Sequence, residues 1–525
     1  MHQLTGEIPL IQRLVISLVA ALIVCPLAAA DPVKITGGLI DGTTLAESGV
    51  HLFKGIPFAA PPAGNRRWQP PAPVEPWEGV LAADTWGSHC MQGEMFGGPL
   101  TTRDESMGED CLYLNVWTPT TDPDAALPVF VVFHGGGFAA GSGSEARTDG
   151  AWFAERGMVV VEPNYRLGLF GFMAHPELSA ESAGRGSGNY GMLDQVAALE
   201  WVRNNVAAFG GDPDNVTING ESAGSMSVSA HMVSPLSKHL VHKAIGQSGA
   251  FFPRPSDNIL EARPLNDKEQ DGVRFAESVG AGSIADLRAM PADDLLAAVM
   301  AQNGGWGYGP GIDGYFLSRP VADSYADGEQ AHIPLVAGWT SSELGMSIAF
   351  NPEKPTLDLF RDELRKIFGK RADDALLVYP ASDQAELNQS AADLASDLFI
   401  SFATWKWIET HSATSGAPVY RYRFDRTIPG DPASEFGAVH AVDIEYSFNT
   451  LDSKRGGWKP ADYAVAKAMA SAFANFVLTG NPNGEGVPDW PEFGESSQVM
   501  YFDDESKSGP EEARARYELL DAVTR

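Results

Sequence analysis

Short apolar runs alternate along the chain with longer segments in which apolar residues recur at helical spacing. The short runs predict strands at 129–133, 158–161, 216–219, 334–337 and 419–424. Apolar residues predominate in 129–133, 158–161 and 334–337, as expected for strands buried on both faces, whereas 419–424 alternates apolar and polar residues, which predicts one face in water. Helical spacing occurs over 193–206 and 463–477. This alternation predicts an α/β fold with a large, mainly parallel, doubly wound sheet and helices on both faces.

The segment 251–330 breaks this alternation, because it is rich in Gly and Pro and predicts irregular structure. We interpret it as an elaborated cap on the sheet. Its aromatic residues either line a substrate gorge or belong to the core: Trp306, Tyr308, Tyr315 and Phe316. No repeat or linker divides the chain, so residues 31–525 are expected to form a single domain.

The first thirty residues have the pattern of a secretory signal. Arg13 precedes an apolar run from Leu14 to Cys25, and Pro26 and three alanines ending at Ala30 follow it. The run is shorter than the roughly 20 residues that a membrane span needs. We therefore expect residues 1–30 to be cleaved, no membrane span to remain, and the mature protein to be secreted or periplasmic.

The charge balance is strongly acidic, with 37 Lys and Arg against 68 Asp and Glu and a formal net charge of −31. Cleavage after Ala30 would remove one cation, Arg13, and one acid, Glu7, and would leave that charge unchanged. Such a surface repels phosphate, so nucleic acid is not expected as a partner.

Two of the three cysteines, Cys90 and Cys111, lie beyond the predicted signal, and the third is Cys25. An even pair in an exported protein predicts one disulfide, and the alternative is two buried thiols. Neither the cysteines nor the histidines have the spacing of metal ligands, so we expect no metal and no cofactor.

A candidate nucleophile lies in Gly220-Glu-Ser-Ala-Gly224, directly after the predicted strand 216–219. A G-x-S-x-G motif between a strand and a helix forms a tight turn that exposes the serine hydroxyl. The N-terminus of the next helix would favour negative charge there. This context makes Ser222 a candidate nucleophile, although a Gly-rich turn without function has the same composition.

A second Gly-rich turn, His134-Gly-Gly-Gly-Phe138, ends the strand 129–133. Glycines let bare backbone approach a substrate closely. Two successive N–H groups of this turn, together with that of Ala223, could bind the oxyanion of a tetrahedral intermediate.

A serine nucleophile needs an imidazole to accept its proton. His440 lies in a loop of small residues late in the chain, where the order nucleophile, acid, base places the base. Spacing alone leaves His411 and His332 as equal alternatives.

The acid that orients the base should follow the nucleophile at the end of a strand. Glu343 comes shortly after the predicted strand 334–337, and Asp313 and Asp323 compete with it.

Taken together, the motifs resemble the type-B carboxylesterase family of α/β-hydrolases, which includes cholinesterases and many microbial esterases. The resemblance runs from about Phe53 to Phe493. Its motifs are 53–62, 109–117, 164–168, 188–195, 209–213 before the Ser222 turn, 475–482 and 490–491.

The resemblance implies an α/β-hydrolase with a Ser222, Glu343 and His440 triad. It further implies that the N–H groups of the oxyanion hole belong to Gly136, Gly137 and Ala223, and that Cys90 and Cys111 form a disulfide. Two positions depart from the family pattern: Ser342 stands where Asp is usual, and Thr101 stands where cholinesterases carry a choline-binding tryptophan. The second departure argues against a specialist for choline esters.

The function expected from these features is cleavage of small carboxylic esters through an acyl-enzyme, without cofactor. Two alternatives have the same fold: an adhesion-like binding protein that does not use its site, and a hydrolase of amides, carbamates or polyesters. The same triad would serve all of these substrates.

Overall fold

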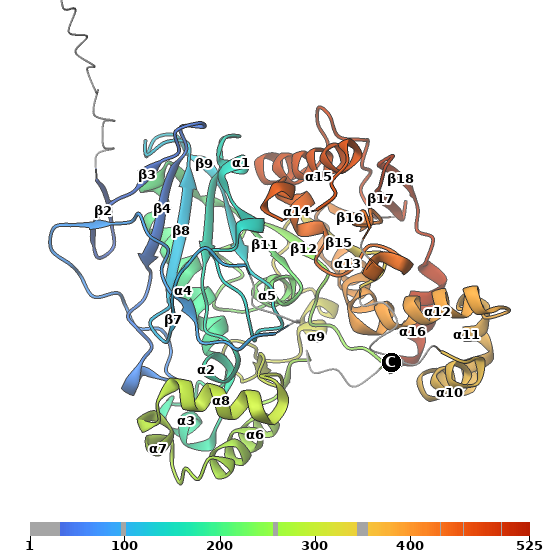
Figure 1. Cartoon of the computed structure of the whole chain (residues 1–525), viewed down its shortest axis with the longest axis horizontal. Helices are drawn as coiled ribbons and strands as arrows, with labels where there is room; N and C mark the ends of the chain where they lie inside the picture. Colours follow the sequence, from blue (N-terminus) through green and yellow to red (C-terminus); the bar gives the residue numbers. More distant parts are fainter. Residues whose placement is uncertain are drawn as a thin grey trace, which may run out of the picture.

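In the computed structural model, the central element is a sheet that runs across the whole molecule (Figure 1). The structure describes residues 32–95, 101–255, 261–343, 355–430, 432–454, 456–494 and 496–524. The predicted signal, 1–30, lies outside these ranges. Within them, eleven strands form the sheet in the order β18-β17-β16-β15-β12-β11-β9-β10-β8-β4-β3. Their bounds are β3 Thr43–Thr44, β4 His51–Pro57, β8 Tyr113–Thr118, β9 Leu127–Phe133, β10 Val159–Pro163, β11 Gly211–Glu221, β12 Lys243–Gln247, β15 Leu335–Thr340, β16 Val419–Phe424, β17 Gln498–Phe502 and β18 Lys507–Pro510.

The strands from β10 to β17 are parallel to their neighbours, and the pairs at both edges are antiparallel. The five predicted strands are all present in the parallel part, so the predicted α/β fold with a mainly parallel sheet is confirmed. Parallel strands end at the same edge of a sheet, which brings the segments after β9, β11, β12 and β15 close together.

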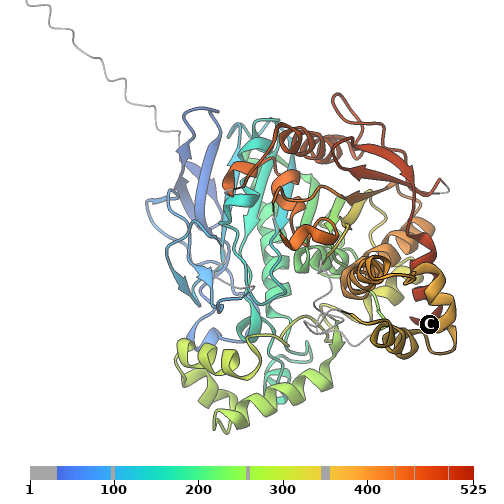
Figure 2. The same cartoon turned by 45° about the vertical axis from the view of Figure 1, so that its right-hand side comes forward.

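Both faces of the sheet are covered by helices, as Figures 1 and 2 show. Alternate residues of β9 pack into two separate cores: Val129, Val131 and Phe133 into one, and Phe130 and Val132 into the other. The first core includes residues of α4 Tyr190–Asn205, α5 Ala223–His231 and α13 Phe402–Ser415. The second includes residues of α1 Ala151–Ala154, α14 Asp443–Ser447 and α15 Pro460–Thr479. Helices α4 and α15 cover the two predicted helical segments.

The prediction of a wet face on 419–424 is wrong. Strand β16 lies between β15 and β17, and only Arg423 is partly exposed. Its other arginine, Arg421, is buried, forms an ion pair with Glu511 and lies 4.2 Å from the centroid of the Trp339 ring. The polar positions in the pattern therefore reflect buried ionic contacts and not solvent.

The segment 251–330, which we call the cap, is irregular only in part, over 251–255 and most of 304–320. It forms α6 Leu265–Ser278, α7 Ile284–Ala289, α8 Ala292–Asn303 and α9 Val321–Ala326. Helices α6, α7 and α8 lie with α3 Pro176–Glu181 at the lower end of the molecule in Figure 1. Some of its prolines and glycines stand at helix ends: Pro264, Pro291 and Pro320 precede α6, α8 and α9, and Gly304 ends α8. The glycines between Gly305 and Gly314 lie outside helices.

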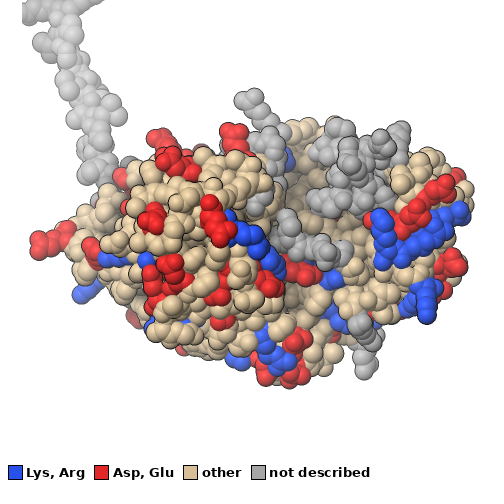
Figure 3. Space-filling view, turned by 90° about the horizontal axis from the view of Figure 1, so that it is seen from below, with Lys and Arg blue, Asp and Glu red and all other residues tan. Residues whose placement is uncertain are grey.

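The C-terminal part adds α10 Leu357–Phe368, α11 Ala372–Val378, α12 Gln384–Ser396 and α16 Arg514–Thr524 beside β16 to β18 (Figure 1). Near the other edge of the sheet, Cys90 and Cys111 form a disulfide. Acidic side chains are scattered over the face in Figure 3 and do not form one patch. Among the described residues, no helix has both the length and the apolar character to cross a bilayer.

Candidate active site

Ser222 stands at the sharp turn between β11 and α5. Its backbone has φ +56° and ψ −120°, a left-handed conformation that is strained for a residue with a side chain. The N–H of Ser222 donates to the carbonyl of Gln247 on the next strand, and the carbonyl of Ser222 accepts from Met226 in the first turn of α5. The surrounding structure thus holds the turn in its strained form.

The glycines of the motif are required by close packing. A Cβ on Gly220 would lie 2.2 Å from the carbonyl carbon of Gly224, and one on Gly224 would lie 2.1 Å from the carbonyl oxygen of Phe133. Larger residues would push α5 away from the end of β9. The spacing of the motif therefore positions Ser222 beside the second Gly-rich turn.

His440 lies between Ser222 and Glu343. Its Nε2 is 2.9 Å from Ser222 Oγ, and its Nδ1 is 2.5 Å from Glu343 Oε2. The N–H of His440 also donates to the carbonyl of Glu343 at 3.0 Å, and the ring meets Phe399 edge to face. Nucleophile, imidazole and carboxylate therefore form one continuous chain of hydrogen-bonding atoms.

The carboxylate of Glu343 is held by neighbours on both sides. Its Oε1 accepts from the N–H of Thr340 at 2.9 Å and from Ser248 Oγ at 2.8 Å, while its own N–H donates to Ser396 Oγ. Ser342, at the position that departs from the family pattern, is buried and pairs with Val439 in an isolated bridge. The acid and the loop of His440 are thus joined through backbone as well as side chains.

The alternative bases lie elsewhere. His411 is buried in α13, where its Nε2 contacts the carbonyl of Ile333, and His332 Nε2 contacts the carbonyl of Gly328. Both rings are satisfied by backbone partners far from the Ser222 turn.

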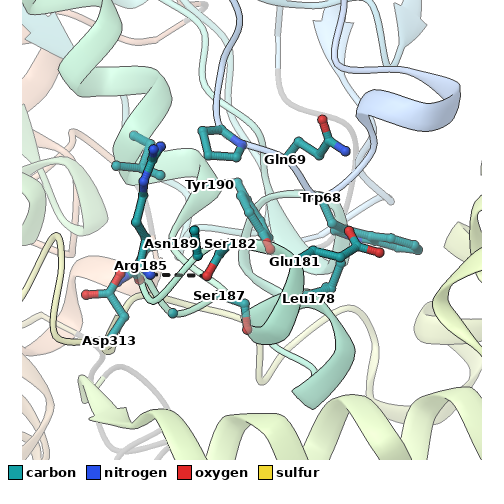
Figure 4. Close-up of a pocket in the computed structure, with 14 residues that line it drawn as sticks. Trp68, Gln69, Leu178, Glu181, Ser182, Arg185, Ser187, Asn189, Tyr190 and Asp313 are labelled. Atoms are coloured by element: carbon teal, nitrogen blue, oxygen red, sulfur yellow. Dashed lines mark hydrogen bonds between the residues drawn. The ribbon is translucent and has the colours of Figure 1, made fainter.

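The alternative acids, Asp313 and Asp323, do not contact His440 in the described part of the chain. Asp313 Oδ1 accepts from three successive N–H groups, those of residues 315 to 317, and so closes a turn. It borders a cavity of about 250 Å³ between the cap and α4, with Tyr190 and Trp68 among the other walls (Figure 4). Asp323 is exposed in the first turn of α9.

The glycine turn after β9 lies directly against the nucleophile. A Cβ on Gly135 would be 3.3 Å from the Cβ of Ser222. Gly136 and Gly137 have φ of +98° and +64°, and a Cβ on Gly136 would lie 2.1 Å from the carbonyl oxygen of Ala140. Within the described part of the chain, the N–H groups of Gly136 and Gly137 donate no hydrogen bond. Ala223 follows Ser222 as the first residue of α5, so its N–H has no partner within the helix.

Glu221, the residue before the nucleophile, places a second carboxyl group at the imidazole. Its Oε1 lies 3.2 Å from His440 Nε2. Burial raises the pKa of Glu221. Burial alone would lower the pKa of His440, but the negative charges of Glu221 and Glu343 raise it. The site therefore stabilises the imidazolium that forms when the serine gives up its proton.

The cap contributes aromatic residues to the surroundings of this turn. A Cβ on Gly137 would lie 2.6 Å from Cζ3 of Trp306, so the indole packs against the turn. Trp306 and Tyr308 line a small cavity together with Gly137, Phe138 and Glu261. Phe316 is fully buried and meets His231 edge to face, which makes it a core residue.

Ser248 and Glu221 were not among the residues predicted from the sequence. Glu221 is the variable position of its motif, which gives no sign of a role. Ser248 follows β12, whose sequence Lys-Ala-Ile-Gly-Gln has too few apolar residues to predict a strand. Across the described ranges, no group of three or more His, Cys, Asp or Glu is arranged to hold a metal ion.

A model of the carboxylesterase family matches residues 29–518. The chain belongs to this family. As a member of this family, it is a carboxylic ester hydrolase. It is 35% identical over 494 residues to fumonisin B1 esterase from Sphingopyxis macrogoltabida, covering 90% of this chain and 86% of the relative. It is also 35% identical over 486 residues to para-nitrobenzyl esterase from Bacillus subtilis, covering 89% and 94%.

Solved carboxylesterase structures share the fold. A carboxylesterase of Geobacillus stearothermophilus superposes with a TM-score of 0.80 at 31% identity, covering 94% of this chain and all of that one. A para-nitrobenzyl esterase structure gives 0.79 at 34% identity, covering 93% and 99%. These matches confirm the predicted α/β-hydrolase fold and the predicted family.

Proposed function

We propose that this carboxylesterase cleaves esters with Ser222 as nucleophile, His440 as general base and acid, and Glu343 as the carboxylate that orients the imidazole. The observation that carries the proposal is the position of His440, with Nε2 2.9 Å from Ser222 Oγ and Nδ1 2.5 Å from Glu343 Oε2. This arrangement has the geometry of a serine-hydrolase triad.

In the proposed reaction, Ser222 Oγ bonds to the ester carbonyl carbon while its proton passes to His440 Nε2. The N–H groups of Gly136, Gly137 and Ala223 bind the oxyanion. The carbon–oxygen bond to the alcohol then breaks, and His440 protonates the departing alcohol. Water repeats both steps on the acyl-enzyme and releases the carboxylic acid. Glu343 holds the imidazole with Nδ1 protonated and stabilises its cationic form.

A fluorophosphonate probe tests this assignment and also separates it from an adhesion-like protein with an idle site. We expect the probe to label the intact protein on Ser222, as located by peptide mass spectrometry. His440→Ala should abolish labelling, whereas His411→Ala, which removes a histidine bound to backbone, should not. Labelling of a different serine, or none, would contradict the proposal.

We further propose that residues 1–30 direct export and that 31–525 are the mature, single-domain enzyme. The support is the apolar run after Arg13 and the three alanines that end at Ala30. N-terminal sequencing of the protein recovered outside the cytoplasm should begin at Asp31. A protein that retains residues 1–30 would contradict cleavage.

Amide, carbamate and polyester cleavage would use the same machinery. A panel of esters of increasing acyl length, compared with the matching amides, measures how far the activity extends beyond simple esters.

A further inference from the structure

Arg254 is a buried cation in the segment that follows β12. It lies six residues after Ser248, the residue that donates to Glu343, and its relative exposure is 6%. All three guanidinium nitrogens are buried without a hydrogen-bond partner in the described part of the chain. Other buried arginines are paired: Arg166, for example, binds both carboxylate oxygens of Asp194.

An unpaired charge in the interior is costly, because it loses its hydration without gaining hydrogen bonds. Burial lowers the pKa of Arg254 to about 10, so the side chain remains protonated at neutral pH. The acid whose charge acts on it is Glu261, yet no hydrogen bond joins the two side chains. Arg254 therefore has the properties of a side chain whose hydrogen bonds and counter-charge come from an anionic ligand.

The surroundings of Arg254 connect it to the oxyanion turn. It lines a cavity of about 80 Å³ with Phe251, Phe252, Glu261, Pro320 and Val321. Glu261 also lines the small cavity that contains Gly137 and Trp306. In addition, Phe251 stacks on Phe138 of the oxyanion turn, with ring centroids 5.8 Å apart. Glu261 and Phe251 therefore link the surroundings of the oxyanion turn to those of Arg254.

We propose that Arg254 binds a free carboxylate carried by the ester substrate. The preferred substrates are then esters with a second, ionised acid group, in either the acyl or the alcohol part. A guanidinium presents a planar pair of donors that matches a carboxylate and gives both charge and direction. The negative charge of Glu261 repels an anion and so weakens this binding. A carboxylate therefore binds only where it contacts the guanidinium of Arg254 directly. The proposal rests on ester cleavage at Ser222.

The test compares two kinds of ester of nearly equal size: esters that carry a free carboxylate, and esters in which a primary amide replaces that carboxylate. Monoethyl glutarate and ethyl 4-carbamoylbutanoate differ in the acyl part, and 4-acetoxybutanoate and 4-acetoxybutanamide differ in the alcohol part. Initial rates are measured at 0.15 M NaCl, where repulsion by the acidic surface is screened beyond about 8 Å. We expect kcat/KM for the carboxylate to exceed that for the amide at least about tenfold in one pair, and the pair that shows it identifies the part of the ester concerned.

Arg254→Gln should remove this preference while keeping kcat/KM for the amide within about threefold, and Glu261→Gln should increase the preference. Arg319→Gln is the matched control, because Arg319 is a partly exposed arginine paired with Asp327 one residue before the cavity wall at Pro320. If Arg254→Gln does not fold, Arg254→Lys, which keeps the charge but not the planar pair of donors, and Glu261→Gln carry the test.

Two results would overturn the proposal: no preference for the carboxylate in either pair, or equal loss on carboxylate and amide substrates in the Arg254 variants. Either result would leave Ser222 chemistry intact, because turnover of the neutral esters reports that chemistry separately.

Discussion

The carboxylate of Glu221 and the imidazole of His440 approach to 3.2 Å, next to the nucleophile. His440 thus faces two carboxylates, Glu221 at Nε2 and Glu343 at Nδ1. Both negative charges raise the pKa of His440, and neutral imidazole is the form that can accept the serine proton. The acid limb of the pH–rate profile should therefore report the charge of Glu221.

Glu221→Gln should move this limb to lower pH. Removing the negative charge lowers the pKa of His440, so the neutral imidazole persists to more acidic conditions. An opposite charge at this distance typically shifts a pKa by about 1 to 3 units, and kcat/KM measured over the whole range in which the protein stays folded, on both sides of about pH 9, should show a displacement of that order. A limb that stays in place or moves to higher pH would mean that Glu221 does not act on His440.

Ser248→Ala should weaken catalysis without affecting substrate binding. The variant removes the hydroxyl that donates to Glu343 Oε1 at 2.8 Å and leaves the N–H of Thr340 as the remaining described donor to that oxygen, so the carboxylate is held less firmly. A hydrogen bond to a charged group contributes about 1.5–3 kcal/mol, so we expect kcat to fall about tenfold or more with KM nearly unchanged. Ser225→Ala is the control, because that buried hydroxyl donates to the carbonyl of Gly249 instead. Equal effects of the two variants would contradict a specific role for Ser248.

Gly136→Ala should disrupt the oxyanion turn. The new Cβ would meet the carbonyl oxygen of Ala140 at 2.1 Å, so the N–H groups of the turn must shift. Losing one such donor typically lowers kcat by about 10²–10³. Gly157→Ala is the control for the conformational strain of a side chain at positive φ. Gly157 has φ +81°, and no atom lies within 4 Å of the added Cβ. A Gly136 variant that keeps more than about half of its activity would argue against this oxyanion hole.

The glycine motifs explain why the Ser222 turn could be predicted, while the identity of its partners could not. Gly220 and Gly224 act within a few residues of Ser222, so their spacing reports the turn directly. His440 and Glu343 are brought to the serine by the order of the strands in the sheet. Spacing along the sequence alone leaves His411 and His332 as equal alternatives for the base, and the family resemblance favours His440. The structure places only His440 beside Ser222, because backbone carbonyls hold the other two rings.

Long-range packing also explains why the sequence pattern of β16 and of the cap differs from their structure. Arg421 gave β16 the pattern of a half-exposed strand, but α16 and Glu511 cover it. In the cap, Pro264 and Pro291 are typical of irregular structure in the sequence, yet each stands just before a helix. Arg254 carries no local signal at all, because its lack of partners is visible only once the surrounding segments are in place.

The disulfide should contribute to stability without taking part in catalysis. Cys90 and Cys111 are 21 residues apart, and closing a loop of that size in the unfolded chain is worth about 3 kcal/mol. The Cys90→Ser, Cys111→Ser double variant should lose about that much free energy of unfolding in urea. A reductant should lower the stability of the wild type in the same way and leave the double variant unchanged. A variant as stable as the wild type would contradict this contribution.

The most direct test of the account is the turnover of p-nitrophenyl butyrate by Ser222→Ala. The variant should keep the circular dichroism spectrum of the wild type, because the hydroxyl only contacts His440 across the site. Its kcat should fall by about 10³ or more, as expected when the nucleophile of a triad is removed. A folded Ser222→Ala variant that retains more than about 10% of wild-type turnover would contradict the assignment of Ser222 as the nucleophile.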